Sequence, residues 1–151
     1  MDRRNELAAR VNELLPILAT KLLHFVKDFP EPDITVPQAF LLNNLRRRGP
    51  STASAIGEIL RVTSGPVTSL TKRLIAKGLV SRHRDENDGR VVWFSLTEEG
   101  VRLAEELDRH SLKRWALVMD LLGLERSEEA LVLLEDTIRV LNQFEKRPGS
   151  E

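Results

Sequence analysis

The sequence lacks cysteine altogether among its 151 residues. This absence excludes disulfide bonds, cysteine-ligated zinc, thiol nucleophiles and sensing by thiol oxidation. The sequence also lacks any apolar run near the roughly 18 residues that a membrane-spanning helix requires. Its first residues are charged and lead into an amphipathic segment, unlike the apolar core of a secretory signal. We therefore expect a cytoplasmic protein with no membrane partner.

Histidine is scarce, and the histidines do not gather. His24, His83 and His110 fall in three different expected elements. The sequence has no H-E-x-x-H pair, no glycine-rich phosphate loop and no G-x-S-x-G turn. A zinc sensor built from histidine and glutamate is a poor alternative, because scattered histidines without cysteine do not make a ligand set. We expect no enzymatic activity, no metal site and no cofactor.

Net charge is absent overall, since 23 basic side chains balance 23 acidic ones. The charge is unevenly distributed, however. Residues 46–90 hold ten Lys and Arg and four Asp and Glu, so this stretch carries +6 and the remainder −6. A basic centre would attract phosphates while the acidic ends would not. The alternative is a solvated face on which basic residues cluster by chance, and charge alone does not separate the two.

Apolar residues recur at helical spacing along most of the chain. They predict helices at about residues 7–29, 36–48, 52–61, 64–77, 98–122 and 127–145, followed by a polar tail from Lys146. Pro16 lies inside the first pattern, which predicts a kink or a later start. Thr35 and Gln38 have the spacing of a capping box for the second helix. In that helix we expect three side chains to be buried, those of Phe40, Leu41 and Leu45.

Between the fourth and fifth helices the apolar period changes to two. Residues 79–84 and 90–96 alternate as strands, and residues 85–89 supply the Asp and Gly of a hairpin turn. The element order predicts a mainly α protein with a small β-hairpin wing. We expect a winged helix-turn-helix at residues 35–100, an N-terminal dimerisation helix at 1–34 and C-terminal dimerisation helices at 101–151.

The fourth expected helix has a polar face opposite Val67, Leu70 and Leu74. The N-terminal part of such a helix enters the major groove in helix-turn-helix proteins. The candidate DNA contacts on this helix are Ser64, Thr68, Ser69, Lys72 and Arg73. Its small hydroxyl residues permit close approach, and its basic residues suit phosphates or guanine edges. The alternative is an ordinary amphipathic surface helix.

The hairpin adds four further candidate contacts. Arg90 at the tip could enter a minor groove, with Asp88 beside it holding the guanidinium. Arg82 and Arg84 alternate along the first strand and could reach phosphates. The alternatives are that Asp88 and Arg90 only close the turn and that Arg82 and Arg84 form a solvated strand face.

Six short motifs occur in an order and spacing typical of one family: residues 49–52, 56–58, 67–74, 77–80, 85–90 and 95–100. Through them the chain resembles the MarR family of winged helix-turn-helix transcriptional regulators. The resemblance covers the whole chain in layout and roughly residues 35–100 in motif. Gly89 departs from the pattern, because arginine often stands between the Asp and Arg of the wing.

The resemblance implies a regulator, often a repressor, that binds double-stranded DNA as a homodimer. It places Thr68, Ser69, Lys72 and Arg73 on the recognition helix and Arg90 at the wing tip. It also implies a small effector, often anionic and aromatic, that releases the DNA. The apolar stripes of the terminal helices independently favour a two-fold dimer, and hence a palindromic operator.

Two questions of function stay open at this point. A winged-helix module that binds protein and not DNA is an alternative function, and so is a DNA-binding member without an effector. In this family the effector pocket tends to lie between the winged unit and the dimerisation helices. Its weak candidate residues are Leu22, Phe25, Phe40 and Trp115. Plain core packing is the better explanation for each of these residues.

Overall fold

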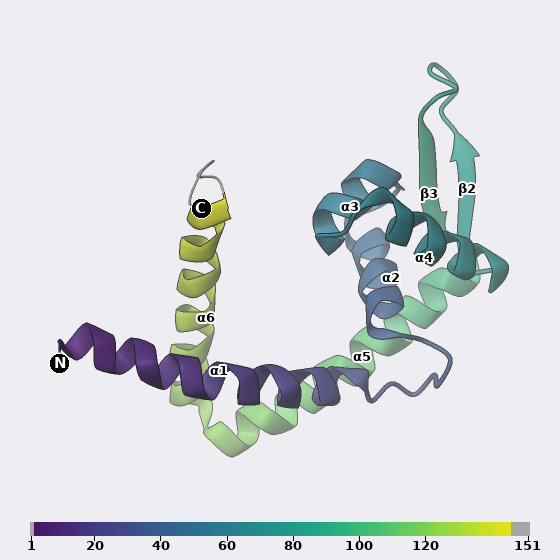
Figure 1. Cartoon of the computed structure of the whole chain (residues 1–151). Helices are drawn as coiled ribbons and strands as arrows, with labels where there is room; N and C mark the ends of the chain where they lie inside the picture. The colour runs from purple at the N-terminus through teal and green to yellow at the C-terminus, as the bar shows by residue number, and fades with distance from the viewer. Residues whose placement is uncertain (1, 146–151) are drawn as a thin grey trace. The chain divides into compact units, whose positions relative to one another are not determined.

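The chain folds into helices with a short hairpin between the fourth and fifth of them (Figure 1). The computed structural model describes residues 2–145, so the polar tail from residue 146 lies outside the described residues. The elements are α1 (Arg3–Lys27), α2 (Val36–Arg48), β1 (Ser51–Thr52), α3 (Ala53–Leu60), α4 (Ser64–Ala76), β2 (Val80–Arg84), β3 (Val92–Leu96), α5 (Glu98–Leu122) and α6 (Leu124–Glu145). This order confirms the predicted fold class, and β1 is an element that was not predicted.

The chain divides within α5 into two compact units. The first extends to Ser111 and contains α1 to α4, the sheet and the beginning of α5. The second begins at Leu112 and contains the rest of α5 and α6. None of the described helices is long and apolar enough to cross a membrane.

The hydrophobic core of the first unit lies where α2, α3, α4 and β3 meet the start of α5. Its fully or nearly fully buried side chains include Leu41, Leu42, Ile56, Val67, Leu74, Phe94, Ala104 and Leu107. Phe40 was predicted to be buried, and this was wrong, because its residue is 51% exposed. At about 100° per residue, Phe40 lies opposite the face that Leu41, Leu42 and Leu45 share. Leu42 takes the core position instead.

The sheet has the strand order β1-β3-β2, with both pairs antiparallel. Ser51 and Thr52 pair with Phe94 and Trp93, which closes the free edge of β3. In the β2–β3 pair, Arg82 of β2 lies opposite Phe94 of β3, and His83 lies opposite Trp93. The two-residue β1 was not predicted because it is too short to show an alternating pattern.

Most helix ends follow their predicted signals. The backbone N–H of Thr35 donates to Gln38 Oε1 at 2.9 Å, which confirms the capping box. Gly123 ends α5 with a φ of +82°. The last helix starts at Leu124, however, and not at the predicted Ser127. The buried Ser127 hydroxyl donates to Gly123 O at 2.8 Å, so it closes the junction between the helices.

Pro16 does not delay the first helix. α1 begins at Arg3, so the alternative of a late start was wrong. Asp2 caps the helix by accepting from Arg4 N–H at 3.4 Å. Thr20 donates its hydroxyl proton to Pro16 O at 2.9 Å. The proline is tolerated within a helix whose described residues all remain unburied.

The connection from β3 to α5 crosses the connection from α4 to β2. Thr97 N–H donates to Leu79 O at 3.1 Å, and Thr97 Oγ1 donates to Gly78 O at 2.6 Å. The same Oγ1 accepts from Gly100 N–H at 3.0 Å, which caps α5 as predicted. Gly100 is buried here, with the Leu79 backbone where a Cβ atom would lie. The close crossing therefore requires glycine at position 100.

Replacing Gly100 with alanine should lower the free energy of unfolding by about 3 kcal/mol, because the added methyl group must displace the Leu79 backbone. Urea denaturation monitored by circular dichroism would measure the loss. Gly65→Ala is the matched control, because a Cβ atom at Gly65 meets nothing within 4 Å. Equal stability of the two variants would contradict the tight crossing.

Candidate nucleic-acid interface

A tight turn joins α3 to α4 and sets their relative direction. Thr52 caps α3 by accepting from Ala55 N–H at 3.3 Å. Arg61 ends the helix in the left-handed region, with a φ of 55°. Val62 N–H then donates to Gly57 O at 3.1 Å. A short helix, this turn and a second helix constitute a helix-turn-helix.

One face of α4 is held in the core by more than apolar contacts. Val67 and Leu74 are buried as predicted, and Leu70 is half-buried. Thr71 is also buried, and its hydroxyl donates to Val67 O at 2.9 Å. The apolar pattern did not indicate this burial, because threonine has no preference for the buried face of a helix. The intrahelical bond satisfies the hydroxyl without a second element.

The opposite face of α4 carries the five predicted contact residues, all of which are exposed: Ser64, Thr68, Ser69, Lys72 and Arg73. Residues four apart are neighbours on a helix. Thr68 and Lys72 therefore form one row, and Ser69 and Arg73 form another. Thr68 donates its hydroxyl proton to Ser64 O at 3.0 Å, so its oxygen can still accept a hydrogen bond.

Asp85 organises the loop between β2 and β3. Its Oδ1 accepts from the N–H groups of Asn87 and Asp88 at 2.9 and 3.0 Å. Its Oδ2 accepts from Trp93 Nε1 at 2.9 Å. The indole donor, and next the two backbone donors, hold the pKa of Asp85 below its ordinary value. This role was not predicted, although an Asp that starts a turn is the usual signal for it.

The tip of the loop is closed by Asp88. Its Oδ1 accepts from Arg90 N–H at 3.0 Å and lies 3.5 Å from Arg90 Nε. The Arg90 side chain is 95% exposed even so. Asp88 therefore closes the turn and also stands beside the guanidinium, so both predicted roles are compatible with the geometry. Arg82 and Arg84 are exposed along β2, and Arg84 donates weakly to Gly89 O at 3.5 Å.

Part of the basic excess of residues 46–90 is neutralised elsewhere in the first unit. Arg46 on α2 pairs with Asp108 on α5 at 2.7 Å, and Arg47 pairs with the same carboxylate at 3.3 Å. Asp108 lies outside the basic stretch in sequence, and its side chain is only 20% exposed. The exposed basic side chains that remain include Lys72 and Arg73 on α4 and Arg82, Arg84 and Arg90 on the hairpin.

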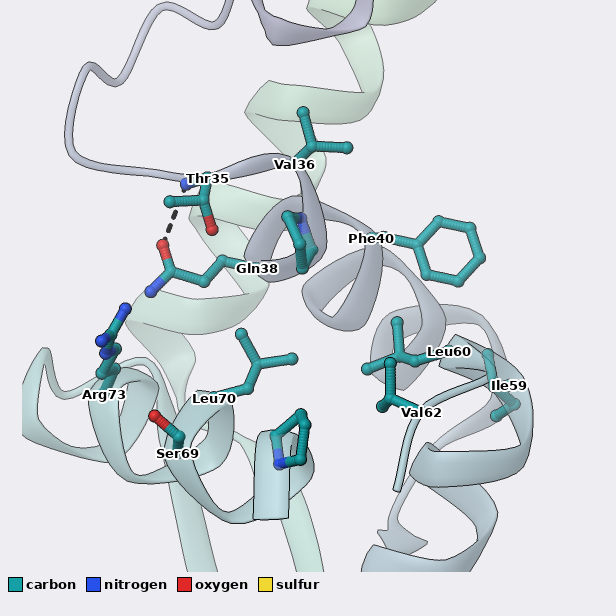
Figure 2. A pocket seen from close by; sticks show the side chains of 12 residues that line it. Thr35, Val36, Gln38, Phe40, Ile59, Leu60, Val62, Ser69, Leu70 and Arg73 are labelled. Carbon is teal, nitrogen blue, oxygen red and sulfur yellow. Dashed lines mark hydrogen bonds between the residues drawn. The ribbon is translucent and has the colours of Figure 1, made fainter. Parts of the chain in front are cut away.

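The effector candidates are dispersed. Phe40 lines a cavity of about 530 Å³ between α2, α3 and α4 (Figure 2). Leu22 and Phe25 lie on α1 and do not line it. Trp115 belongs to the second unit. Within residues 2–145, no group of three or more His, Cys, Asp or Glu side chains could hold a metal ion.

Comparison with known proteins connects this geometry with a family. A family model described as a winged helix DNA-binding domain matches residues 34–100. The crystal structure of a mutant of MarR from E. coli complexed with operator DNA superposes with a TM-score of 0.74 and 24% identity, over 91% of this chain and 99% of that one. The transcriptional repressor MdtR of Bacillus subtilis is 30% identical over 108 residues, which are 71% of this chain and 70% of the repressor. The chain belongs to the MarR family of winged-helix transcriptional regulators.

A second relative has a higher sequence identity over a shorter segment. The organic hydroperoxide resistance transcriptional regulator of Bacillus subtilis is 40% identical over 74 residues, or 49% of this chain. The match spans half the length of that regulator. The predicted family, fold class and general function as a transcriptional regulator are confirmed by these comparisons. The roles of individual residues stay predictions.

The contact between Trp93 and Asp85 should be visible in a pH titration. The pKa of Asp85 is lowered in the folded chain, so its charged form stabilises the folded hairpin. This stabilisation is fully present at pH values above the ordinary pKa of 3.8, and it is lost as the pH falls through the lowered pKa. Trp93→Phe removes the indole donor and should raise the pKa of Asp85 towards 3.8. A pH titration of the Asp85 carboxyl carbon by NMR, in the unmodified protein and in Trp93→Phe, would measure this pKa. An unchanged pKa would show that the backbone donors suffice.

Proposed function

We propose that this protein binds a palindromic operator in double-stranded DNA as a homodimer and represses transcription there. The main support for this proposal is the exposed face of α4, which carries hydroxyl and basic side chains and is followed by a hairpin with Arg90 at its tip. Such a regulator works on the chromosome, so its proposed location is the cytoplasm. The DNA complex of E. coli MarR, whose fold this chain shares, supports the proposal.

On α4 the two kinds of side chain have different proposed tasks. Ser64, Thr68 and Ser69 belong to the first two turns and are short enough to let the helix backbone approach base edges. Lys72 and Arg73 lie further along and carry the charge that phosphates attract. Contacts to bases provide sequence preference, whereas contacts to phosphates provide affinity for any duplex.

The wing is proposed to contact the neighbouring minor groove. Arg90 is almost fully exposed and is flanked by Asp88, which limits the orientations of its guanidinium. A narrow minor groove at A·T pairs concentrates negative potential and attracts such a side chain. Arg82 and Arg84 on β2 are proposed to contact the adjoining backbone.

The dimer is proposed because each unit exposes an apolar helix face. On α1 the exposed residues include Leu7, Val11, Leu14 and Leu18, and on α6 they include Leu131, Leu134, Ile138, Leu141 and Phe144. Ser127 apart, every side chain described on α6 is exposed. Faces of this extent are rare on monomers. A second copy of the chain supplies matching faces with two-fold symmetry, and two α4 helices then meet successive major grooves.

Thr68→Ala and Lys72→Ala should weaken DNA binding in different ways. Against an operator selected from randomised duplexes, Thr68→Ala should reduce the preference over random DNA by about tenfold, because it removes a base contact. Lys72→Ala should weaken binding to the operator and to random duplex by the same factor. It should also reduce the slope of log K against log salt concentration by about 0.9 for each phosphate that the lysine neutralises in the unmodified protein. Fluorescence anisotropy titrations at several salt concentrations measure both effects.

The unmodified protein provides the control for these titrations. It should bind its selected operator more tightly than random duplex, with a strong dependence on salt. If it binds no duplex even at low salt, the winged-helix unit is a protein-interaction module instead. If it binds but neither variant changes the binding, α4 does not face the DNA.

Leu134→Glu should convert the dimer to a monomer. An unpaired charge at a buried interface costs about 3 kcal/mol, and two-fold symmetry places it there twice. Gln143→Glu introduces the same charge on the opposite side of α6, so it is the matched control and should leave the dimer intact. Light scattering at micromolar concentration gives the mass of each protein. A monomeric unmodified protein, or a dimeric Leu134→Glu variant, would contradict the proposed interface.

A further inference from the structure

The loop of the hairpin, residues 85–90, is held by one side chain of the central strand. β3 lies between β1 and β2, and its Trp93 pairs with Thr52 on one side and with His83 on the other. The indole Nε1 of Trp93 donates to Asp85 Oδ2 at 2.9 Å. Because the strand of Trp93 is paired on both sides, this bond ties the loop at the end of the hairpin to the most constrained strand of the sheet (Figure 1).

A single carboxylate transmits this restraint to the tip of the loop. Asp85 Oδ1 accepts from the N–H groups of Asn87 and Asp88 at 2.9 and 3.0 Å. The backbone N–H of Asp85 donates to Val91 O, and Val91 N–H donates to Asp88 O, both at 2.9 Å. Asp88 Oδ1 then accepts from Arg90 N–H at 3.0 Å. A continuous series of hydrogen bonds therefore connects the indole with the arginine at the tip.

Apolar packing does not hold this loop. Asp85 is half-buried, and residues 86–90 are all exposed. Gly89 adds conformational freedom at the tip, because glycine loses more backbone entropy than any other residue when it is ordered. A loop that becomes ordered only on binding spends part of its interaction free energy on that ordering. Hydrogen bonds that order the loop beforehand remove this cost.

We propose that Trp93 is a positioning residue for DNA binding, which orders the loop through Asp85 and thereby presents Arg90 to the minor groove. The proposal rests on the proposed function, in which Arg90 enters that groove. Trp93 acts through the carboxylate and does not itself touch the DNA. An arginine on an ordered loop loses less freedom on binding than one on a mobile loop, so the same contact gives a higher affinity.

The order of the loop can be measured without DNA. Nitrogen-15 relaxation of the full chain gives backbone order parameters, which should be near about 0.85 for residues 86–90 in the unmodified protein and below about 0.6 in Trp93→Phe. Phenylalanine keeps an aromatic ring in the strand and removes the N–H donor. Asp85→Asn breaks the same contact from the other side if its oxygen keeps the two backbone donors, because an amide nitrogen cannot accept from the indole. It should mobilise the loop equally, while β2 and β3 stay ordered in both variants.

A double-mutant cycle tests whether Trp93 acts through Arg90. In anisotropy titrations with the selected operator, Trp93→Phe should weaken binding about fivefold. Arg90→Ala should weaken it further, and adding Trp93→Phe to Arg90→Ala should cause no additional loss, because no side chain is left to position. Arg82→Ala is the matched control. Arg82 lies on β2 outside the loop, so its loss and that of Trp93→Phe should multiply in the double variant.

A tryptophan that only stabilised the sheet would give a different pattern. Its replacement would lower the melting temperature, measured by circular dichroism, and would weaken binding equally with Arg90 present or absent. That equal loss would overturn the proposal, as would an operator affinity that Trp93→Phe leaves unchanged. Unchanged order parameters in both Trp93→Phe and Asp85→Asn would overturn it as well.

Failure of the proposed function would be recognised separately. If the unmodified protein binds no duplex, the proposed function fails, and the order parameters still decide whether Trp93 holds the loop. If Trp93→Phe does not fold, Asp85→Asn provides the order parameters. A loop that stays ordered in Asp85→Asn would then contradict the proposal.

Discussion

The geometry of the proposed DNA-binding surface depends on one backbone crossing. Thr97 and Gly100, at the start of α5, contact Gly78 and Leu79, which connect α4 to β2. The hydroxyl of Thr97 both caps α5 and donates across the crossing. α4 ends next to this crossing, β2 begins there and β3 ends there. The crossing therefore fixes the orientation of the hairpin relative to α4. A rigid separation between these two elements is what reading two grooves at once requires.

The sequence predicted the features that arise from local signals. The capping box of Thr35, the turn glycines and the change of apolar period identified the element order. The misplacement of Phe40 and the missed burial of Thr71 have another origin. Which residues of a helix face inward depends on where its neighbours pack, and an apolar residue on the far side of α2 looks the same in sequence as one in the core.

The electrostatics show the same limit. The balance of charges in residues 46–90 predicted a basic region, but Arg46 and Arg47 are held by Asp108, a residue distant in sequence. Asp85 was counted as an acid within that region, but its carboxylate accepts hydrogen bonds from the Trp93 indole and from two backbone N–H groups. Net charge describes a segment, while the field at a surface depends on which charges are paired and where they lie.

α4 serves three surfaces with 13 residues. Val67, Thr71 and Leu74 face the core, Thr68 and Lys72 face outward, and Ser69 and Arg73 lie between the outward face and the cavity. Any substitution at Arg73 therefore alters the outward face and the cavity together. Phe40, Leu60 and Val62 belong to other segments and touch the cavity from its opposite end. Variation at these three positions can therefore change the apolar end of the cavity without altering the charge that α4 carries.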